Sequence, residues 1–132
     1  MSDLFDLSGR TALVTGSSRG LGQSLAAGLV DAGARVIVHG RSREGVADSA
    51  ALLAARTGAR VETVVFDVTD AAAVDAAITE LVARVGVPDI LVNNAGIQRR
   101  APFAEFSVAD WDQVIATNLS SAFYVSRFVV PG

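Results

Sequence analysis

Four short apolar runs alternate with longer segments of helical pattern along this chain, and this alternation limits the fold more than any other feature. The runs span residues 11–15, 35–39, 61–66 and 89–92. Near-continuous apolar strands joined by helices are typical of a parallel sheet that is covered on both faces. Because crossover connections are right-handed, we expect an α/β fold with a doubly wound parallel sheet and the strand order 3-2-1-4.

Helical spacing of apolar residues and capping residues predict the segments between and after these strands. They are residues 21–32, 44–56, 69 or 70 to about 85, and a last helix that begins at the cap Ser107. In the first helix the spacing is carried by Leu21, Leu25, Leu29 and Val30. Glycines follow the first three helices and are expected to end them.

Composition narrows the possible functions. The chain has 132 residues, which fits one domain, and a net charge of −3, which argues against nucleic acid or an anionic membrane as a partner. With no cysteine and one histidine, we expect no disulfide and no metal site. The sequence shows neither a signal-peptide pattern nor an apolar run near the ~20 residues of a membrane span, so the cytoplasm is the expected location. All eleven basic residues are arginine, so these residues alone cannot complete a mechanism that needs lysine.

A glycine-rich loop follows the first apolar run. Glycine at this place lets the backbone turn tightly and approach a pyrophosphate, while the start of the next helix offers free N–H groups. The spacing is G-x-x-x-G-x-G. We predict that the cofactor-binding residues here are Gly16, Ser18, Arg19, Gly20, Leu21 and Gly22. The alternative is an ordinary glycine-rich turn.

The end of the second strand indicates which dinucleotide is bound. An acidic residue there would bind the ribose 2′-hydroxyl of NAD, but residues 39–43 contain no carboxylate. Arg41, with Arg19 of the glycine loop, can pair with a 2′-phosphate, and Ser42 lies beside Arg41. We therefore expect NADP(H). The alternative is that Arg41 and Arg43 are only solvated charges.

An ordered series of motifs then identifies a family resemblance. The series is residues 15–22, then Asp67-Val68, then residues 93–96 with the sequence Asn-Asn-Ala-Gly, then Asn118. Together they resemble the short-chain dehydrogenase/reductase family over essentially the whole chain, and the fold that this implies is Rossmann-like.

The resemblance implies roles for residues outside the glycine loop. Asp67 and Val68 would contact the adenine of the cofactor. Asn94, Ala95 and Gly96 would support the sheet and line the cofactor. Asn118 would help to organise a proton relay, and it is the one catalytic residue that we predict; the alternative is a polar residue on a helix surface. An intact family member would be a homo-oligomer, a dimer or a tetramer.

The catalytic groups that the family uses are not found here. They are a serine and a Tyr-x-x-x-Lys motif, whereas the single tyrosine, Tyr124, has Phe128 four residues later and is expected to be a packing residue. We therefore expect residues 1–132 to form a partial dinucleotide-binding domain, truncated after about four strands and four helices, with the catalytic part absent. Such a fragment is expected to be inactive alone.

Residues 93–103 give the best indication of a substrate. They are similar to the branch of the family that interconverts sugar acids of the gluconate and 5-ketogluconate type. Arg99 or Arg100 could hold a carboxylate by a bidentate pair, or both could be exposed loop residues. Three alternatives stay open: another NADPH-dependent ketone reductase such as an oxoacyl-carrier reductase, a non-catalytic dinucleotide-binding module, and a remnant that folds poorly. An apolar edge at the fourth strand and an apolar patch with Trp111, Phe123 and Phe128 would favour association.

Overall fold

The computed structural model describes residues 2–131. Its strands are β1 (Thr11–Val14), β2 (Arg35–Gly40), β3 (Glu62–Val65) and β4 (Ile90–Val92). Its α-helices are α1 (Gly20–Asp31), α2 (Arg43–Thr57), α3 (Ala71–Val85), α4 (Val108–Ile115) and α5 (Ser121–Val129). Two short 3-10 segments, η1 (Ser2–Phe5) and η2 (Phe103–Glu105), and a π-helical segment, η3 (Ala116–Ser120), complete the secondary structure of the described residues.

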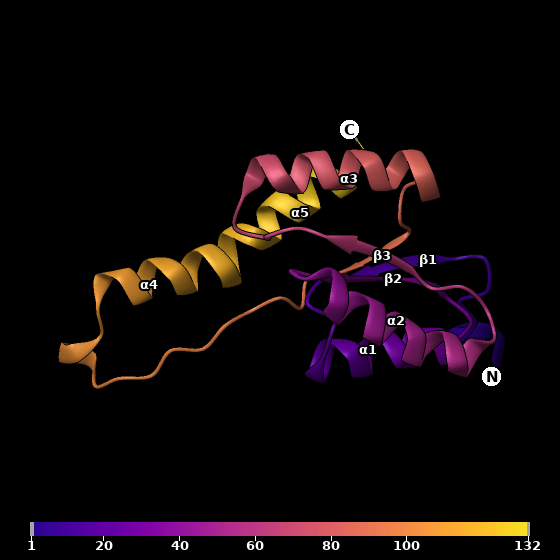
Figure 1. Ribbon diagram of the computed structural model, residues 1–132, viewed down its shortest axis with the longest axis horizontal. Helices are drawn as coiled ribbons and strands as arrows, with labels where there is room; N and C mark the ends of the chain where they lie inside the picture. The colour runs from indigo at the N-terminus through magenta and orange to yellow at the C-terminus, as the bar shows by residue number, and fades with distance from the viewer. Residues whose placement is uncertain (1, 132) are drawn as a thin grey trace.

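The four strands form one parallel sheet in the order β3-β2-β1-β4. The register places Leu13 of β1 opposite Ile37 of β2 on one side and Leu91 of β4 on the other. Helices α1 and α2 lie on one face of the sheet, and α3 and α5 lie on the other (Figure 1). This confirms the doubly wound parallel sheet and its predicted strand order, with β4 at an edge.

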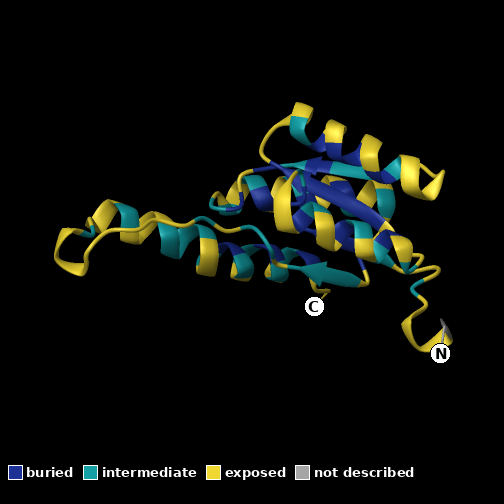
Figure 2. Cartoon of the chain, turned by 90° about the horizontal axis from the view of Figure 1, so that it is seen from below, coloured by how far each residue is buried: buried dark blue, intermediate teal, exposed yellow. Residues whose placement is uncertain are grey.

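The core consists of two apolar clusters, one on each face of the sheet. Because successive strand residues point to opposite faces, Leu13 and Ile37 pack with α3 and α5, whereas Val14, Val36 and Val38 pack with α1 and α2. Figure 2 shows the central strands β1 and β2 mostly buried, the outer strands β3 and β4 mostly intermediate, and the outer helix faces exposed. Burial on both faces explains why the strands read as apolar runs without alternation.

The buried face of α1 differs from the one that the apolar spacing indicated. Leu21 is 71% exposed and Leu25 is 39% exposed, while the buried positions are Gly22, Ala26 and Val30. Small residues on this face let the helix approach β1 and the glycine loop closely. The helix therefore turns Leu21 and Leu25 away from the sheet, while Leu29 packs partly against the core, and Leu21 borders the cleft described below.

The last helix is also different from the prediction. Ser107 caps α4 as expected, with its Oγ accepting a bond from Asp110 N at 3.0 Å. The chain then passes through η3 before it continues as α5, so one predicted helix is three consecutive segments. π-Helical turns inside α-helices are rare, and those that occur are often found at functional sites. In Figure 1, α4 extends well beyond the end of the sheet where the strands finish.

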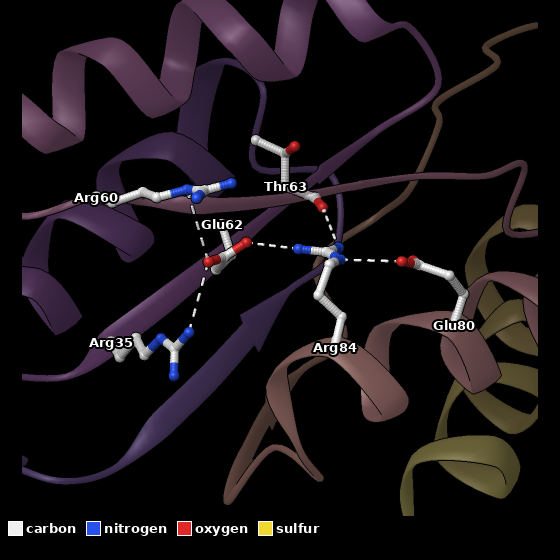
Figure 3. A network of polar contacts seen from close by, with 6 residues as sticks. All are labelled: Arg35, Arg60, Glu62, Thr63, Glu80 and Arg84. Atoms are coloured by element: carbon white, nitrogen blue, oxygen red, sulfur yellow. Dashed lines mark hydrogen bonds and ion pairs between the residues drawn. The ribbon is translucent and has the colours of Figure 1, made fainter.

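Polar contacts fasten the edge strand β3 near its start (Figure 3). The carboxylate of Glu62 is only 11% exposed and lies within 3.5 Å of Arg35 on β2 and 3.8 Å of Arg60. It also pairs with Arg84 of α3, whose Nη2 donates to Thr63 O at 3.0 Å. This network ties β3 to its neighbouring strand and to the helix above it, at the end of the sheet where the strands begin.

Among residues 2–131, no helix is long and apolar enough to cross a membrane.

Tyr124 packs at the margin of the core beside α3 and forms an edge contact with the ring of Phe123, with centroids 6.0 Å apart. This agrees with its predicted role as a packing residue.

Candidate functional site

An open cleft of about 660 Å³ lies where the strands end. Most of the predicted cofactor residues gather there: Gly16, Ser18, Arg19, Gly20, Leu21, Gly22, Arg41, Asp67, Val68, Asn94, Ala95 and Gly96. Arg99 also lines the cleft, whereas Ser42, Arg100 and Asn118 are outside its lining. In open α/β sheets, ligands bind outside the carboxyl ends of the strands, so this is the expected place for one.

The glycine loop has the conformation that its sequence predicts. Gly16 and Gly20 have φ values of +64° and +58°, which favour glycine over residues with a Cβ. A Cβ on Gly22 would lie 2.1 Å from the carbonyl oxygen of Gly16, so the first turn of α1 rests directly on the loop. The N-cap residue Arg19 makes no side-chain capping bond to the N–H groups of that turn. These amides are therefore available to an anion at the helix N-terminus.

Two side chains fasten the glycine loop to the segment after β4. Thr15 Oγ1 accepts hydrogen bonds from the backbone N–H groups of Asn94 and Ala95, both at 3.0 Å. The amide Nδ2 of Asn94 donates to Thr15 O at 3.1 Å and to Gly16 O at 3.2 Å. Asn94 thus joins the ends of β1 and β4 and forms part of the floor of the cleft.

The far end of the cleft carries Arg41 and Asp67. Asp67 Oδ1 accepts from the backbone N–H of Thr69 at 2.9 Å and from its hydroxyl at 2.7 Å. These two bonds hold the pKa of Asp67 below its ordinary value, and the charge of Arg41 lowers it further. Ser42 turns away: its Oγ accepts from Gly45 N at 3.0 Å and caps α2.

Asn118 holds the segment that follows the Asn-Asn-Ala-Gly motif. Its Oδ1 accepts from Ile97 N at 2.8 Å and its Nδ2 donates to Ile97 O at 2.9 Å, so one amide side chain satisfies both backbone groups of one residue. A Cβ on Gly96 would lie 3.2 Å from Asn118 Oδ1, which leaves little space for a larger residue. The side chain comes from η3, and the π-helical turn presents it to residues 96–97.

The two candidate substrate arginines have different surroundings. Arg99 Nη2 donates to Gln113 Oε1 on α4 at 3.1 Å, and its Nε lies 3.9 Å from Asp110 Oδ1. Arg100 is exposed and does not line the cleft. Of the two, only Arg99 is placed where it could meet a ligand in the cleft.

Several residues that line the cleft were not predicted from the sequence. They are His39, Gly40, Thr69, Ile97, Gln113, Ala116 and Thr117. Gln113, Ala116 and Thr117 come from α4 and η3; the sequence had placed only Asn118 of this stretch at the site. His39 could have been found from the sequence, because apart from Arg35 at the start it is the only polar residue of the apolar run 35–39.

The geometry fits a dinucleotide. The volume of the cleft lies within the usual range for cofactor pockets, and a Cβ on Gly20 would meet nothing within 4 Å, so the space above the loop is open. Among residues 2–131, no group of three or more His, Cys, Asp or Glu side chains could hold a metal ion.

Comparison with known proteins supports the same interpretation. Residues 10–132 match the family described as short chain dehydrogenase. The chain belongs to this family. Among relatives of this short-chain dehydrogenase chain is a gluconate 5-dehydrogenase of Gluconobacter oxydans, which is 50% identical over 127 residues, 96% of this chain and 49% of the relative. A 5-keto-D-gluconate 5-reductase of Escherichia coli is 42% identical and is matched over 98% of this chain and 50% of its own length.

A solved structure has a closely similar fold. A gluconate 5-dehydrogenase from Burkholderia cenocepacia, crystallised in complex with NADP and tartrate, superposes with a TM-score of 0.92 at 48% identity. The match covers 97% of this chain and 50% of that one. The short-chain dehydrogenase chain described here therefore spans about half the length of the relatives it matches.

Proposed function

We propose that this chain supplies the cofactor-binding part of an oxidoreductase that transfers a hydride between NADP(H) and a sugar acid of the gluconate or 5-ketogluconate type. The observation that carries the proposal is that the glycine loop, Arg41 and Arg99 line one cleft at the carboxyl ends of the strands. The relatives' names, and the NADP in the Burkholderia structure, support the choice of cofactor and substrate class.

Within this proposal, each part of the cleft has one task. The N–H groups at the start of α1 bind the pyrophosphate, and Asp67 and Val68 border the adenine. Asn94, Ala95 and Gly96 line the path toward the nicotinamide. The bound cofactor supplies the hydride chemistry, and the chain positions it. Asn118 acts by holding Ile97, which makes it a positioning residue rather than a proton donor.

The preference for NADP(H) depends on Arg41. Its exposed guanidinium lies at the end of the cleft where a ribose 2′-phosphate would sit, and a charge-assisted bond there contributes to binding of NADPH but not of NADH. Calorimetric titration of Arg41→Ala should show NADPH affinity reduced by roughly tenfold or more, with NADH affinity little changed. Arg43→Ala is the matched control, because Arg43 is outside the lining of this cleft. Equal losses for both variants would contradict the assignment.

The substrate class depends on Arg99. Its guanidinium is held by Gln113 and lines the cleft, where it can pair with a carboxylate. In a longer protein that carries the catalytic serine and the Tyr-x-x-x-Lys motif, oxidation of NADPH with 5-ketogluconate, compared with a 3-oxoacyl thioester, separates the sugar-acid enzyme from an oxoacyl-carrier reductase. Residues 1–132 alone are expected to bind NADPH without turning over either substrate, because they contain no lysine, and turnover by them would contradict the proposal.

Assembly and location belong to the same proposal. Exposed apolar side chains on α4, η3 and α5, among them Trp111, Leu119 and Phe123, support a homo-oligomer. A cytoplasmic location is expected for an enzyme of this proposed chemistry, and fractionation of the source cells tests it.

A further inference from the structure

The backbone of Gly16, at the start of the glycine loop, is held on several sides. Its N–H donates to His39 Nδ1 at 2.9 Å, and its carbonyl accepts from Asn94 Nδ2 at 3.2 Å. Its oxygen also lies where a Cβ on Gly22 would collide with it. The two peptide groups that flank the Cα of Gly16 are thus each held by contacts with other residues, and the imidazole of His39 holds the first of them.

The contacts of the imidazole define its protonation state. Nδ1 accepts from the Gly16 amide and therefore carries no proton, while Nε2 lies 2.9 Å from the carbonyl oxygen of Phe66, to which it can only donate. Only the neutral ring with its proton on Nε2 satisfies both contacts. The ring is held against Phe66, with centroids 4.1 Å apart, and His39 is 2% exposed.

The backbone of His39 is joined to the same loop by a buried network. Ser17 N donates to His39 O at 2.9 Å, and His39 N donates to Ser17 Oγ at 3.0 Å. The hydroxyl of Ser17 donates in turn to Val14 O, and the hydroxyl of Ser49 on α2 donates to Ser17 O at 2.8 Å. A change in the protonation of the His39 ring is therefore expected to alter the hydrogen bonds of residues 16 and 17 directly.

Few charges oppose the neutral ring. Burial lowers the pKa of His39, while its bond to the Phe66 carbonyl and the negative charge of Asp67 act in the opposite direction. Asp67 lies at the end of β3 and interacts with Arg41 at the end of β2. From α1 and α2 the network receives the neutral side chains of Gln23 and Ser49.

We propose that His39 is a positioning residue of the cofactor site: in its neutral form it holds the Gly16 amide, and with it the glycine loop, in the conformation that binds the pyrophosphate. Protonation of Nδ1 would set two N–H donors against each other and release Gly16. Acid should therefore weaken cofactor binding through a residue that need not touch the cofactor. The inference rests on the proposed function, because it concerns the same cleft.

Two near-isosteric substitutions separate the two ring contacts. In His39→Asn, the amide oxygen can take the place of Nδ1 and accept from Gly16. In His39→Gln, the amide nitrogen can reach the place of Nε2 and donate to Phe66, but Gly16 loses its acceptor. We expect His39→Asn to bind NADPH almost as the unchanged protein does, and His39→Gln to bind about tenfold more weakly at equal folded content by circular dichroism. Equal affinities for the two variants would overturn the proposal.

The pH profile provides a readout that a purely structural role would not move. Between about pH 7.5 and about pH 5.5, NADPH affinity should fall more steeply for the unchanged protein than for His39→Asn, which cannot titrate. The 2′-phosphate of NADPH titrates near pKa ~6, and the variant corrects for this because both proteins bind the same cofactor. Parallel profiles would contradict a role for the imidazole.

A cofactor-free measurement keeps this inference separate from the proposed function. His39 is the only histidine in the sequence, so ¹⁵N labelling of histidine gives one imidazole signal pair. We expect the Nε2–H tautomer at neutral pH, with the Gly16 amide signal moving as the ring titrates. An Nδ1–H tautomer or a charged ring at neutral pH would overturn the inference. If NADPH binding cannot be measured but the expected tautomer and the Gly16 response are seen, the proposed function and the positioning role are refuted. The hydrogen bond between the Gly16 amide and His39 Nδ1 would still stand.

Discussion

The three glycines of the loop meet different physical requirements at the residue scale. Gly20 needs only its positive φ, because open space surrounds the place of a Cβ. Gly22 has an ordinary helical backbone but no space, since a Cβ would lie 2.1 Å from Gly16 O and 2.5 Å from Asn94 Nδ2. Gly16 combines a positive φ with little space, since a Cβ there would lie 3.0 Å from the Cα of Ala95. A glycine-rich motif is therefore a set of separate constraints that happen to select one residue type.

Gly22→Ala should destabilise the protein, because the methyl group would collide with backbone that cannot move without disturbing the loop. We expect the free energy of unfolding to fall by about 1–3 kcal/mol, as for overpacked sites. Gly28→Ala on the same helix is the control: nothing lies within 4 Å of its Cβ, and a gain of about 0.5–1 kcal/mol is expected. Urea unfolding measures both, and a loss for Gly28→Ala as large as that for Gly22→Ala would contradict the steric argument.

The buried imidazole should also make stability depend on pH. Burial lowers the pKa of His39 in the folded state below the unfolded value of about 6.5, so between these two values the unfolded chain binds the extra proton. The stabilisation is complete above about pH 6.5 and is lost as the pH falls through the folded pKa. Urea unfolding from about pH 7.5 to about pH 5 should show a decline that His39→Asn lacks. Curves of equal slope would show that His39 does not keep its neutral form preferentially.

At the scale of elements, the π-helical segment η3 decides where the cleft ends. It interrupts the helical run between α4 and α5 and places Asn118 against Ile97, while Ala116 and Thr117 line the cleft. The irregular segment from Asn93 to Pro102 has no helix or strand of its own. Its position near the cleft therefore depends on side chains from other elements.

Asn118→Ala should loosen this irregular segment with little loss of global stability, because the side chain is exposed and the two lost bonds are local. Hydrogen exchange of the Ile97 amide should become faster, whereas amides of β1 should keep their rates. Leu119→Ala is the matched control, since Leu119 is 64% exposed on the same segment. Faster exchange in both variants would show that η3 itself, rather than the Asn118 amide, holds the loop.

At the scale of the whole molecule, helices cover both faces of the sheet, but α4 lies beyond the sheet (Figure 1). Helices α1 and α2 cover β1 and β2 on one face, while α3 and α5 cover the other, and β4 stands at an edge (Figure 1). Helix α4 projects past the end of the sheet where the strands finish (Figure 1), with Trp111 58% exposed, and Phe123 of α5 is 62% exposed. Phe128, predicted to belong to the exposed patch, is instead half-buried against the core.

Replacing one of these side chains with a charge should weaken association. Phe123→Glu is expected to shift the protein toward smaller species in size-exclusion chromatography with light scattering, because a carboxylate would have to be desolvated at an apolar contact. Leu52→Glu on α2, where Leu52 is 61% exposed, should leave the distribution unchanged. An unchanged mass for Phe123→Glu beside an associated unchanged protein would place the contact elsewhere.

The sequence by itself determined the order of strands and helices, the strand order of the sheet, the glycine loop and most of the residues around the cleft. The elements and the glycine loop follow from local signals, which are apolar runs, caps such as Asp70 and Ser107, and glycines at turns. The cleft residues after β3 and β4 followed instead from the family resemblance. Only the tertiary structure decided that α1 buries Gly22 and Ala26 rather than Leu21 and Leu25, since that face depends on how closely the helix meets the loop. It likewise decided the π-helical turn at Asn118 and the two contacts of His39. The contacts of His39 and Asn118 join residues that are 21 to 27 positions apart in the sequence. Contacts over such separations are set by tertiary packing rather than by any local pattern.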